Sequence, residues 1–429
     1  MEFLLILALF LVLMFMGAPI GTSLGVSAVA TIMYFDLGAE MLGVNFASGI
    51  ASFPLLAIPF FVLAGVILQR AGIAAHIACF FEMLVGRAVG GLSIVAVLTC
   101  MFWGAMSGSG PATTAAVGMI LLAPMLKNGY DKAFAGATIA NASDLSIIIP
   151  PSIAFIIYGN ITSVSVSALF VAGIIPGLLT GLATMLVAWY ISYRRGYRGL
   201  VCRSCFTDLC KALRQSFWAL MAPVVILGGI YTGIFTPTEA AVVAVFYSLF
   251  VAVVIYRSIG WRDLVEILVE SAVTSSVIMF IVAFAGIFTW AASVTGVIDA
   301  LAEFIIQISP NAVVMIILVN ILLFALGMIL DAISISYLLM PILIPVLSAF
   351  NVDPVFYGVI FISALAIGQA TPPVGVNLFT AANLVGCDVD EIAREAIPYV
   401  IMDFVVLIII SLIPALSLFL PQWAGLYSP

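Results

Sequence analysis

The chain has 429 residues, of which 65% are hydrophobic and 8% are charged, and its formal net charge is −7. A soluble domain could not bury so much apolar surface, so this composition predicts a polytopic membrane protein. The sequence contains no GxxxxGKS/T string, which argues against an ATP-driven pump. The longest polar interval, about residues 194–216, is too short for a soluble domain.

Apolar runs of roughly 17–25 residues, long enough to cross a bilayer, recur along both halves of the chain. The first half has predicted spans at about 2–16, 19–35, 48–69, 133–162 and 168–193. The second half has predicted spans at about 217–235, 237–256, 264–291, 354–385 and 396–420. Each half also carries an amphipathic segment, at 74–86 and near 297–308, followed by a helix–turn–helix unit, at 88–126 and 311–350. The predicted fold class is an all-α polytopic membrane protein.

A proline pair interrupts one long apolar run in each half. Pro150-Pro151 follows the polar string ANASD, and Pro372-Pro373 follows GQAT. Proline removes a backbone donor and blocks the preceding helical turn. Inside hydrocarbon, such a break is tolerated where the freed backbone groups face protein, water or a bound ion. The sequence therefore predicts two discontinuous helices, at 133–162 and 354–385, beside a binding site.

Helix-breaking and small residues recur in the same order in both halves, at offsets of 218 to 222. The matched anchors are Pro19 with Pro237, Ala64-Gly65 with Ala285-Gly286, Pro124 with Pro345, the two proline pairs, and Pro176 with Pro398. This recurrence predicts two repeats, 1–196 and 215–429, joined by a basic linker at 197–214. Five spans per repeat is an odd number, so the repeats are predicted to have inverted topology.

Charge predicts the orientation of these spans. With the N-terminus outside, all 13 Lys and Arg residues fall on the inner side, as the positive-inside rule requires. Glu2 stands where a signal peptide would carry a basic residue, so the first apolar run is predicted to be a retained span. Each helix–turn–helix unit is predicted as a re-entrant hairpin, although two full crossings would leave the same charge pattern. The outer side receives Asp36, Glu40, Asp299, Glu303 and Asp353.

Small and polar residues mark the tips of both hairpins. The first tip reads GAMSGSGPATTAAVG and the second reads GMILDAISISYLLMP. Asp331 in the second tip and Asp144 beside the first proline pair are carboxylates in apolar runs, which is costly unless they are paired or bind an ion. The alternatives are a structural helix N-cap for each Asp and back-bonding to helix carbonyls for the hydroxyl side chains.

These polar groups predict ion and substrate sites, because backbone carbonyls and Ser, Thr, Asn and Asp oxygens suit Na⁺ and helix N-termini suit a carboxylate. One Na⁺ is predicted between the first tip and the first break, at Ser107, Gly108, Ser109, Asn141, Ser143 and Asp144. A second is predicted between the second tip and the second break, at Asp331, Ser334, Gln369 and Thr371. The predicted substrate contacts are Ser109, Thr113, Ser152, Ser336, Gly375 and Asn377. No other metal and no organic cofactor is expected.

Four motifs, SGSGPATTAAVG, ANASDLSIIIPPS, GIFTPTEAA and GQATPPVGVN, together resemble the large membrane subunit of TRAP transporters (tripartite ATP-independent periplasmic transporters). The resemblance covers essentially the whole chain. It implies an Na⁺-driven elevator mechanism in the bacterial inner membrane and a carboxylate substrate such as a sialic acid or a C4-dicarboxylate. In sialic-acid members, a Ser in the first hairpin and a Ser after the first proline pair lie near substrate. Those positions correspond here to Ser107 or Ser109 and to Ser152.

The same resemblance implies two partners on separate chains: a small four-helix membrane subunit and a periplasmic substrate-binding protein. Membrane lipids are a further expected partner, and nucleic acid is not. The alternative is a stand-alone Na⁺/carboxylate symporter or exchanger that needs no binding protein. An enzyme such as an intramembrane protease is not expected, because the sequence has one His, His76, and no HExxH string.

Overall fold

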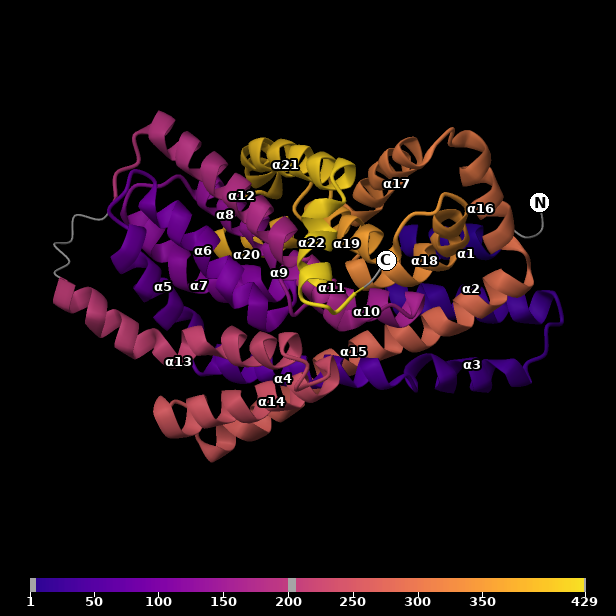
Figure 1. The fold of residues 1–429 in the computed structure, drawn as a ribbon, viewed down its shortest axis with the longest axis horizontal. Coiled ribbons are helices and arrows are strands. Elements are labelled where there is room, and N and C mark those ends of the chain that lie inside the picture. The colour runs from indigo at the N-terminus through magenta and orange to yellow at the C-terminus, as the bar shows by residue number, and fades with distance from the viewer. Residues whose placement is uncertain (1–4, 200–205, 428–429) are drawn as a thin grey trace.

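The protein is described by a computed structural model over residues 5–199 and 206–427, and every regular element in those ranges is a helix (Figure 1). Nine of the described helices are long and apolar enough to cross a membrane. The predicted all-α membrane-protein class is therefore confirmed. The start of the first predicted span and the middle of the predicted linker lie outside the described residues.

The helices of the first half are α1 (Leu5–Phe15), α2 (Ile20–Tyr34), α3 (Glu40–Ile50), the 3₁₀ turn η2 (Phe53–Leu56), α4 (Ala57–Arg70), α5 (Ile73–Val85), α6 (Gly91–Ser107), α7 (Gly110–Lys127), α8 (Lys132–Ser143), α9 (Leu145–Ile148), α10 (Ile153–Thr162), α11 (Val166–Ala172) and α12 (Ile174–Arg195). Those of the second half are α13 (Phe206–Tyr231), α14 (Pro237–Leu249), the π-helical turn η3 (Phe250–Ile255), α15 (Trp261–Val294), α16 (Val297–Ile308), α17 (Ala312–Gly327), α18 (Ala332–Ala349), α19 (Pro354–Gln369), α20 (Val376–Val385), α21 (Val389–Leu412) and α22 (Ala415–Trp423).

The third predicted span, 48–69, is not one continuous helix. It contains the end of α3, an extended residue at Ser52 and the turn η2 before α4 begins. Pro54 lies at the start of that turn, where it lacks the N–H that a continuous helix would use. The corresponding helix of the second half, α15, has no proline and runs unbroken for 34 residues.

Two boundaries of the second half also differ from prediction. Helix α13 begins at Phe206, inside the segment predicted as the linker, because the stretch from Phe206 to Ser216 contains neither Gly nor Pro. The last predicted span, 396–420, is two helices, since α21 ends at Leu412 and α22 begins after Pro414.

Separate helices flank each predicted hairpin turn and each predicted helix break. Helices α6 and α7 form the first unit and α17 and α18 the second, and in Figure 1 they occupy opposite halves of the molecule's long axis. The first broken helix comprises α8, α9 and α10, and the second comprises α19 and α20. The Pro150–Pro151 and Pro372–Pro373 peptide bonds are both cis.

The helices pack as two groups. Helices α1–α4 and α13–α15 form one group, which we call the scaffold group, with α15 packed on α2, α3 and α4 and with α14 packed on α4. Helices α6–α12 and α17–α22 form the other, which we call the hairpin group. Helix α5 packs on both α13 and α6, and α16 packs on both α15 and α18, so these amphipathic helices bridge the groups.

Helix pairings in the two halves correspond. Helix α2 packs on α15 as α14 packs on α4, and α6 packs on α8 as α17 packs on α19. Likewise, α7 packs on α20 as α18 packs on α10. The anchor residues that recur in the sequence therefore accompany recurring contacts between helices.

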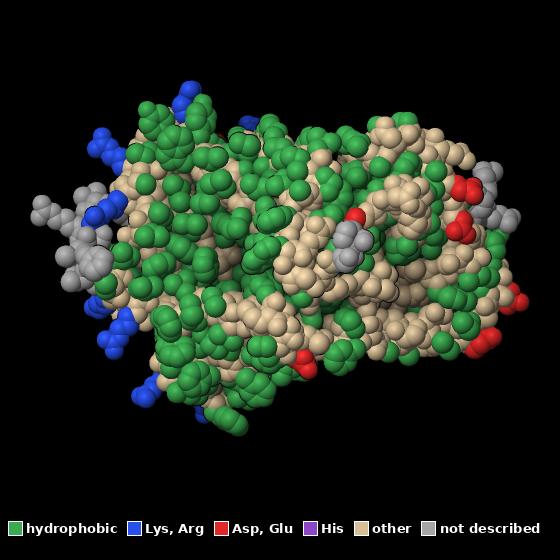
Figure 2. Space-filling view, viewed as in Figure 1, with side chains coloured by type: hydrophobic (Ala, Val, Ile, Leu, Met, Phe, Trp, Pro, Cys, Tyr) green, Lys and Arg blue, Asp and Glu red, His purple; other side chains and the backbone are tan. Residues whose placement is uncertain are grey.

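Charged side chains gather at the ends of the molecule. Figure 2 shows Lys and Arg at the end where α6 and α13 lie, and Asp and Glu mainly at the opposite end, with a broad hydrophobic band between them. Most of the exposed large side chains of α13, α14 and α15 are apolar, such as Phe217, Phe246 and Val273. This distribution is what a bilayer around the middle of the molecule requires.

Candidate functional site

The tip of the first hairpin rests against the first helix break. Gly108 adopts a φ of +60°, and a Cβ at this position would lie 3.2 Å from both the Pro151 carbonyl oxygen and the Ile153 nitrogen. Glycine therefore permits both the left-handed turn and the close approach. The Ser107 and Thr113 hydroxyls lie 2.7 Å apart, so a hydrogen bond joins the end of α6 to the start of α7.

Helix α7 starts directly at this tip. Ser109 is extended, and Gly110 and Pro111 begin the helix, with proline in the first turn where its missing N–H costs least. The Ser109 side chain caps no backbone group and lines a cavity instead. A Cβ on Gly110 would lie 2.8 Å from the Asn377 side chain, so the first tip also touches the second helix break.

Asp144 joins the two breaks. Its Oδ1 accepts a hydrogen bond of 2.7 Å from Asn377 Nδ2, which links the residue after α8 to the first turn of α20. Asp144 is 1% exposed and Asn377 is fully buried. The Asp144 side chain caps no helix N-terminus, so the structural N-cap alternative does not apply to it.

Several buried oxygens at this junction accept no hydrogen bond from any described residue. They are Asp144 Oδ2, Asn141 Oδ1 and Asn377 Oδ1, which we call the oxygen cluster. Asn141 uses its Nδ2 to donate to the Ala137 carbonyl at 2.8 Å, so its free oxygen remains an acceptor. A buried acceptor without a donor costs about 1–3 kcal/mol. One carboxylate and two amide oxygens form a donor set that fits a hard cation such as Na⁺.

The second tip differs from the first. Asp331 Oδ2 accepts from the backbone N–H groups of Ile333 at 3.0 Å and Ser334 at 3.3 Å, and Oδ1 accepts from Ser334 Oγ at 2.5 Å. Asp331 is therefore the N-cap of α18, as the structural alternative predicted. Its half-buried side chain also lines the cavity, so an additional ion contact stays a prediction.

The second break is tied to the second tip through the backbone. The Gly375 N–H donates to the Met328 carbonyl at 2.9 Å. The Thr371 hydroxyl donates to the Ile367 carbonyl at 2.7 Å, and the Ser336 hydroxyl donates to the Ala332 carbonyl at 2.6 Å. Both hydroxyls thus follow the back-bonding alternative, and each keeps acceptor capacity.

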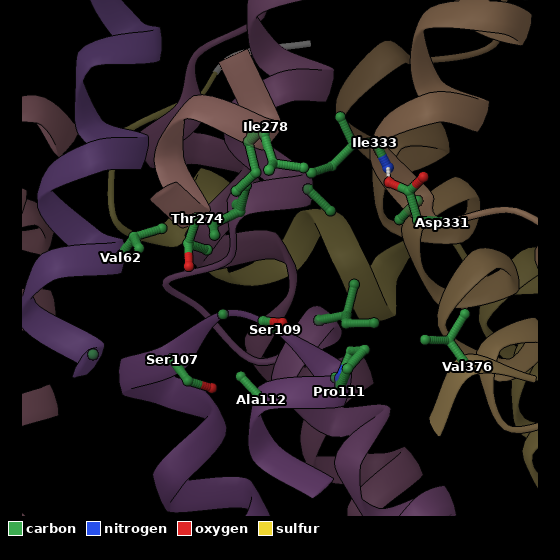
Figure 3. Close-up of a pocket in the computed structure, with 18 of the residues that line it drawn as sticks. Val62, Ser107, Ser109, Pro111, Ala112, Thr274, Ile278, Asp331, Ile333 and Val376 are labelled. Atoms are coloured by element: carbon green, nitrogen blue, oxygen red, sulfur yellow. Dashed lines mark hydrogen bonds between the residues drawn. The ribbon is translucent and has the colours of Figure 1, made fainter. Parts of the chain in front are cut away.

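A cavity of about 510 Å³ lies between the tips and the scaffold group. In Figure 3, Ser107, Ser109 and Pro111 of the first tip face Asp331 of the second tip and Thr274 of α15 across this space. Helix α4 completes the wall with Val62, Gly65, Val66 and Gln69. The cavity therefore has one wall from each hairpin tip and one from the scaffold group.

The structure brings part of the predicted site to the cavity and places the rest behind its wall. Of the predicted residues, those that line the cavity are Ser107, Gly108, Ser109, Asp331 and Gln369. Those that do not line it are Thr113, Asn141, Ser143, Asp144, Ser152, Ser334, Ser336, Thr371, Gly375 and Asn377. Ser143 donates to the Ile139 carbonyl at 2.7 Å and faces Cys100, whereas the Ser152 hydroxyl is buried with no partner among the described residues.

The sequence analysis did not select the scaffold side of the cavity. Gln69, Glu270 and Thr274 line it from α4 and α15. Each is a polar residue in a predicted apolar span, and that signal could have identified them. Trp103, one turn before Ser107 on α6, also lines the cavity and carries no polarity pattern that would distinguish it from a core residue.

The GIFTPTEAA motif lies at a helix start outside the cavity. Thr236 and Glu239 form a capping box at the start of α14. The Glu239 carboxylate accepts from the Thr236 N–H at 2.8 Å, and Thr236 Oγ1 accepts from the Glu239 N–H at 3.3 Å. The GIFTPTEAA motif therefore sets a helix boundary.

Comparison with known proteins identifies relatives over nearly the whole chain. The family model described as "Tripartite ATP-independent periplasmic transporter, DctM component" matches residues 7–416. The C4-dicarboxylate TRAP transporter large permease protein DctM of Pseudomonas aeruginosa is 39% identical over 405 residues, which cover 94% of this chain and 95% of that protein. The sialic acid TRAP transporter large permease protein SiaM of Vibrio cholerae is 36% identical over 415 residues and 96% of each chain.

Two further comparisons involve a longer relative and a protein that is similar in fold. The isethionate TRAP transporter permease protein DctMQ of Oleidesulfovibrio alaskensis is 36% identical over 417 residues, and the match spans 65% of that longer protein. The solved structure of the YdaH transporter from Alcanivorax borkumensis aligns with a TM-score of 0.63 at 15% identity, covering 90% of this chain and 87% of that one, and shows the fold alone. The family match and these identities establish that this chain belongs to the DctM family of large membrane components of tripartite ATP-independent periplasmic transporters.

Proposed function

We propose that this chain is the membrane subunit through which an organic anion enters the cell, driven by Na⁺ and supplied by a periplasmic binding protein. The observation that carries the proposal is the oxygen cluster at Asp144, Asn141 and Asn377, where both broken helices meet. Three acceptor oxygens without donors, enclosed away from water, favour a bare cation over a neutral ligand.

Two or more sodium ions are needed for such transport. Moving one negative charge into a cell with an inside-negative potential costs about 2.3 kcal/mol per 100 mV. A dianion therefore requires at least two Na⁺ for the transported charge to be zero. With three or more Na⁺ the net charge is positive, and the inside-negative potential then drives transport inward. The second ion is proposed at the second tip, where Asp331, Ser334, Gln369 and Thr371 retain acceptor oxygens.

The substrate is proposed to bind in the cavity between the tips. The N-terminus of α7 reaches this cavity without a side-chain cap, and free N–H groups at a helix N-terminus favour a carboxylate. The N-terminus of α18 also reaches the cavity, but Asp331 already accepts from its Ile333 and Ser334 N–H groups. The relatives are named for C4-dicarboxylates, sialic acid and isethionate, all of which are organic acid anions. By this likeness we propose a carboxylate, with a C4-dicarboxylate and a sialic acid as the first candidates.

Transport is proposed to follow an elevator mechanism, in which the hairpin group slides along the scaffold group. Support comes from the cavity at the boundary between the two groups and from α5 and α16, which bridge them. The recurring helix pairings support two inverted repeats with re-entrant hairpins. The gathering of Lys and Arg at one end supports an N-terminus on the periplasmic side of the inner membrane.

The partners are proposed from the family. A small membrane subunit and a periplasmic binding protein would complete the transporter, and the greater length of the DctMQ relative leaves room for a second membrane part. The competing proposal is a stand-alone Na⁺/carboxylate carrier.

Uptake into proteoliposomes tests the proposal. The purified chain and the small subunit from the same gene cluster would be reconstituted, and uptake of radiolabelled succinate and N-acetylneuraminate would be followed under an inward Na⁺ gradient. We expect uptake that needs both Na⁺ and the cognate binding protein. Uptake without the binding protein would favour the stand-alone carrier, and uptake unaffected by replacing Na⁺ with K⁺ would contradict sodium coupling.

A further inference from the structure

An ion pair joins α4 to α15 beside the cavity, and one of its members, Glu270, lines the cavity. Because Glu270 is partly exposed, we call this edge of the cavity its mouth. Arg70, the last residue of α4, donates to Glu270 Oε2 of α15 through Nη2 at 2.9 Å and through Nε at 3.3 Å. Arg70 Nη1 also lies 3.6 Å from Glu266 Oε2. The Arg70 and Glu270 side chains are 46% and 41% exposed, whereas Ser107, Ser109 and Asp331 of the hairpin tips are half-buried.

The charged side chains that line the cavity are all of one sign. The charged residues in its described lining are Glu270 and Asp331, and both are acidic. The Asp331 carboxylate is engaged in the cap of α18. Glu270 is therefore the charge that an anion approaches at the mouth, and Arg70 is the group that neutralises it.

Both members of the pair belong to the scaffold group. The guanidinium of Arg70 can hold a carboxylate through two parallel N–H donors, whether that carboxylate is Glu270 or an anion passing through the mouth. An anion at the mouth would thus compete with Glu270 for the same donors. The strength of the Arg70–Glu270 ion pair would therefore affect how easily an anion passes the mouth of the cavity.

We propose that Arg70 and Glu270 form an electrostatic gate, in which an organic anion leaving the cavity exchanges with Glu270 at the Arg70 guanidinium. The inference rests on the proposed function as an anion transporter. It goes beyond that function by assigning a role in passage to two residues that belong to the scaffold group and to neither predicted ion site.

A purely structural pair makes a different prediction. If the ion pair merely joins α4 to α15, Arg70→Gln and Glu270→Gln each remove the same link and have effects of the same sign. The two substitutions change the local potential in opposite directions whatever the role of the pair, since one removes a negative charge and the other a positive charge. If the pair is a gate, they also change the KM for the passing anion in opposite directions, because Glu270→Gln frees the Arg70 guanidinium and Arg70→Gln removes it. The sign of the two effects on KM therefore separates the readings.

The potential can be measured without a known substrate. Thr274 is exposed and points into the cavity one turn beyond Glu270 (Figure 3). In a variant lacking the six native cysteines, Thr274→Cys would be labelled with the negatively charged sulfonatoethyl methanethiosulfonate and the positively charged trimethylammonioethyl methanethiosulfonate. Val277→Cys, on the same wall, replaces it if Thr274→Cys does not fold.

We expect the ratio of anionic to cationic labelling rates to rise by about threefold or more in Glu270→Gln and to fall by a similar factor in Arg70→Gln. Both changes should shrink at 1 M salt, where charges a few ångströms apart are screened. Arg195→Gln is the matched control, because Arg195 pairs with Glu395 at 2.7 Å and does not line the cavity. Changes of the same sign in both variants, or no change, would overturn the gate.

Exchange of the substrate across the proteoliposome membrane gives a second readout. Glu270→Gln should lower the KM measured from the cavity-mouth side and lower the maximal rate, because the freed Arg70 retains the anion. Arg70→Gln should raise that KM. If the wild-type protein exchanges neither succinate nor N-acetylneuraminate, the proposed substrate class fails, and labelling ratios that do not change as expected still overturn the gate.

Discussion

The second hairpin tip and the first helix break each carry one carboxylate, and the two differ in how the carboxylate oxygens are satisfied. At the second tip, the Asp331 carboxylate accepts from two backbone N–H groups and the Ser334 hydroxyl, all within its own helix start. At the first break, Asp144 takes one hydrogen bond from a residue 233 positions away, and its second oxygen has no donor among the described residues. Two carboxylates with the same predicted role therefore differ in their chemical surroundings.

This difference has an energetic meaning. A carboxylate whose oxygens already accept from its own helix is stable without a ligand. A buried carboxylate beside two free amide oxygens is stabilised when a cation arrives. The first break is therefore expected to depend more strongly on bound Na⁺, and the second tip to depend on its Asp331 cap. The following substitutions test that contrast, from the largest expected effect to the smallest.

Asp144→Asn should have the largest effect. The substitution removes the negative charge from the oxygen cluster and adds an N–H group that can donate to Asn141 Oδ1 or Asn377 Oδ1. Na⁺ affinity should fall by at least 100-fold and Na⁺-driven uptake should be lost, while thermal stability without Na⁺ stays equal or rises. Isothermal calorimetry and uptake measure these effects. The control is Asp403→Asn, a second buried carboxylate on α21, which should keep its Na⁺ response.

Asp331→Ala should abolish Na⁺-dependent uptake while the protein still inserts into the membrane. Loss of the N-cap should also lower the free energy of unfolding by about 1 kcal/mol, with or without Na⁺. Asp131→Ala is the control for the loss of an N-cap, since Asp131 accepts from the Ala133 and Phe134 N–H groups at the start of α8. It should lose similar stability and retain uptake. Full uptake by Asp331→Ala would remove Asp331 from the ion site.

Gly108→Ala tests the contact between the first tip and the first break. Alanine in the left-handed region costs about 1–2 kcal/mol, and its Cβ would press on Pro151 and Ile153. Gly129→Ala carries the same left-handed cost, with a φ of +81°, but has open space around it. We expect uptake to fall about tenfold in Gly108→Ala and to change little in Gly129→Ala. Equal uptake in the two variants would show that the close approach of Gly108 to Pro151 and Ile153 does not affect transport.

Ser152→Ala and Ser336→Ala should give the smallest effects and differ from each other. Ser152 has no hydrogen-bond partner among the described residues, whereas Ser336 donates to its own helix. Removing the Ser152 hydroxyl should not destabilise the free protein and should raise the KM for substrate a few-fold. Removing the Ser336 hydroxyl should cost at most about 1 kcal/mol. A rise in KM confined to Ser336→Ala would reverse this assignment.

Sequence reasoning predicted the helical class, the hairpins and the broken helices because these follow from local chemistry. Hydrophobic runs define spans, and proline pairs end helices wherever they occur. It missed the interruption at Ser52 and the early start of α13, since a single proline or a polar but helix-favouring stretch can belong to a helix or to a loop. It also missed Gln69, Glu270 and Thr274, which become part of the cavity only through the packing of α4 and α15 against the tips.

The sequence by itself determined that the chain crosses a membrane, that two halves carry the same pattern of breaks, and that polar tips lie near those breaks. These conclusions depend on residue type and order, which local sterics and hydration translate directly into helices and interruptions. Only the tertiary structure decided that Asn377 reaches Asp144, that Asp331 satisfies its own helix, and that Arg70 meets Glu270 at the mouth of the cavity. Each of these contacts depends on the direction of a side chain across a packed interface, and no periodicity in the sequence encodes that direction.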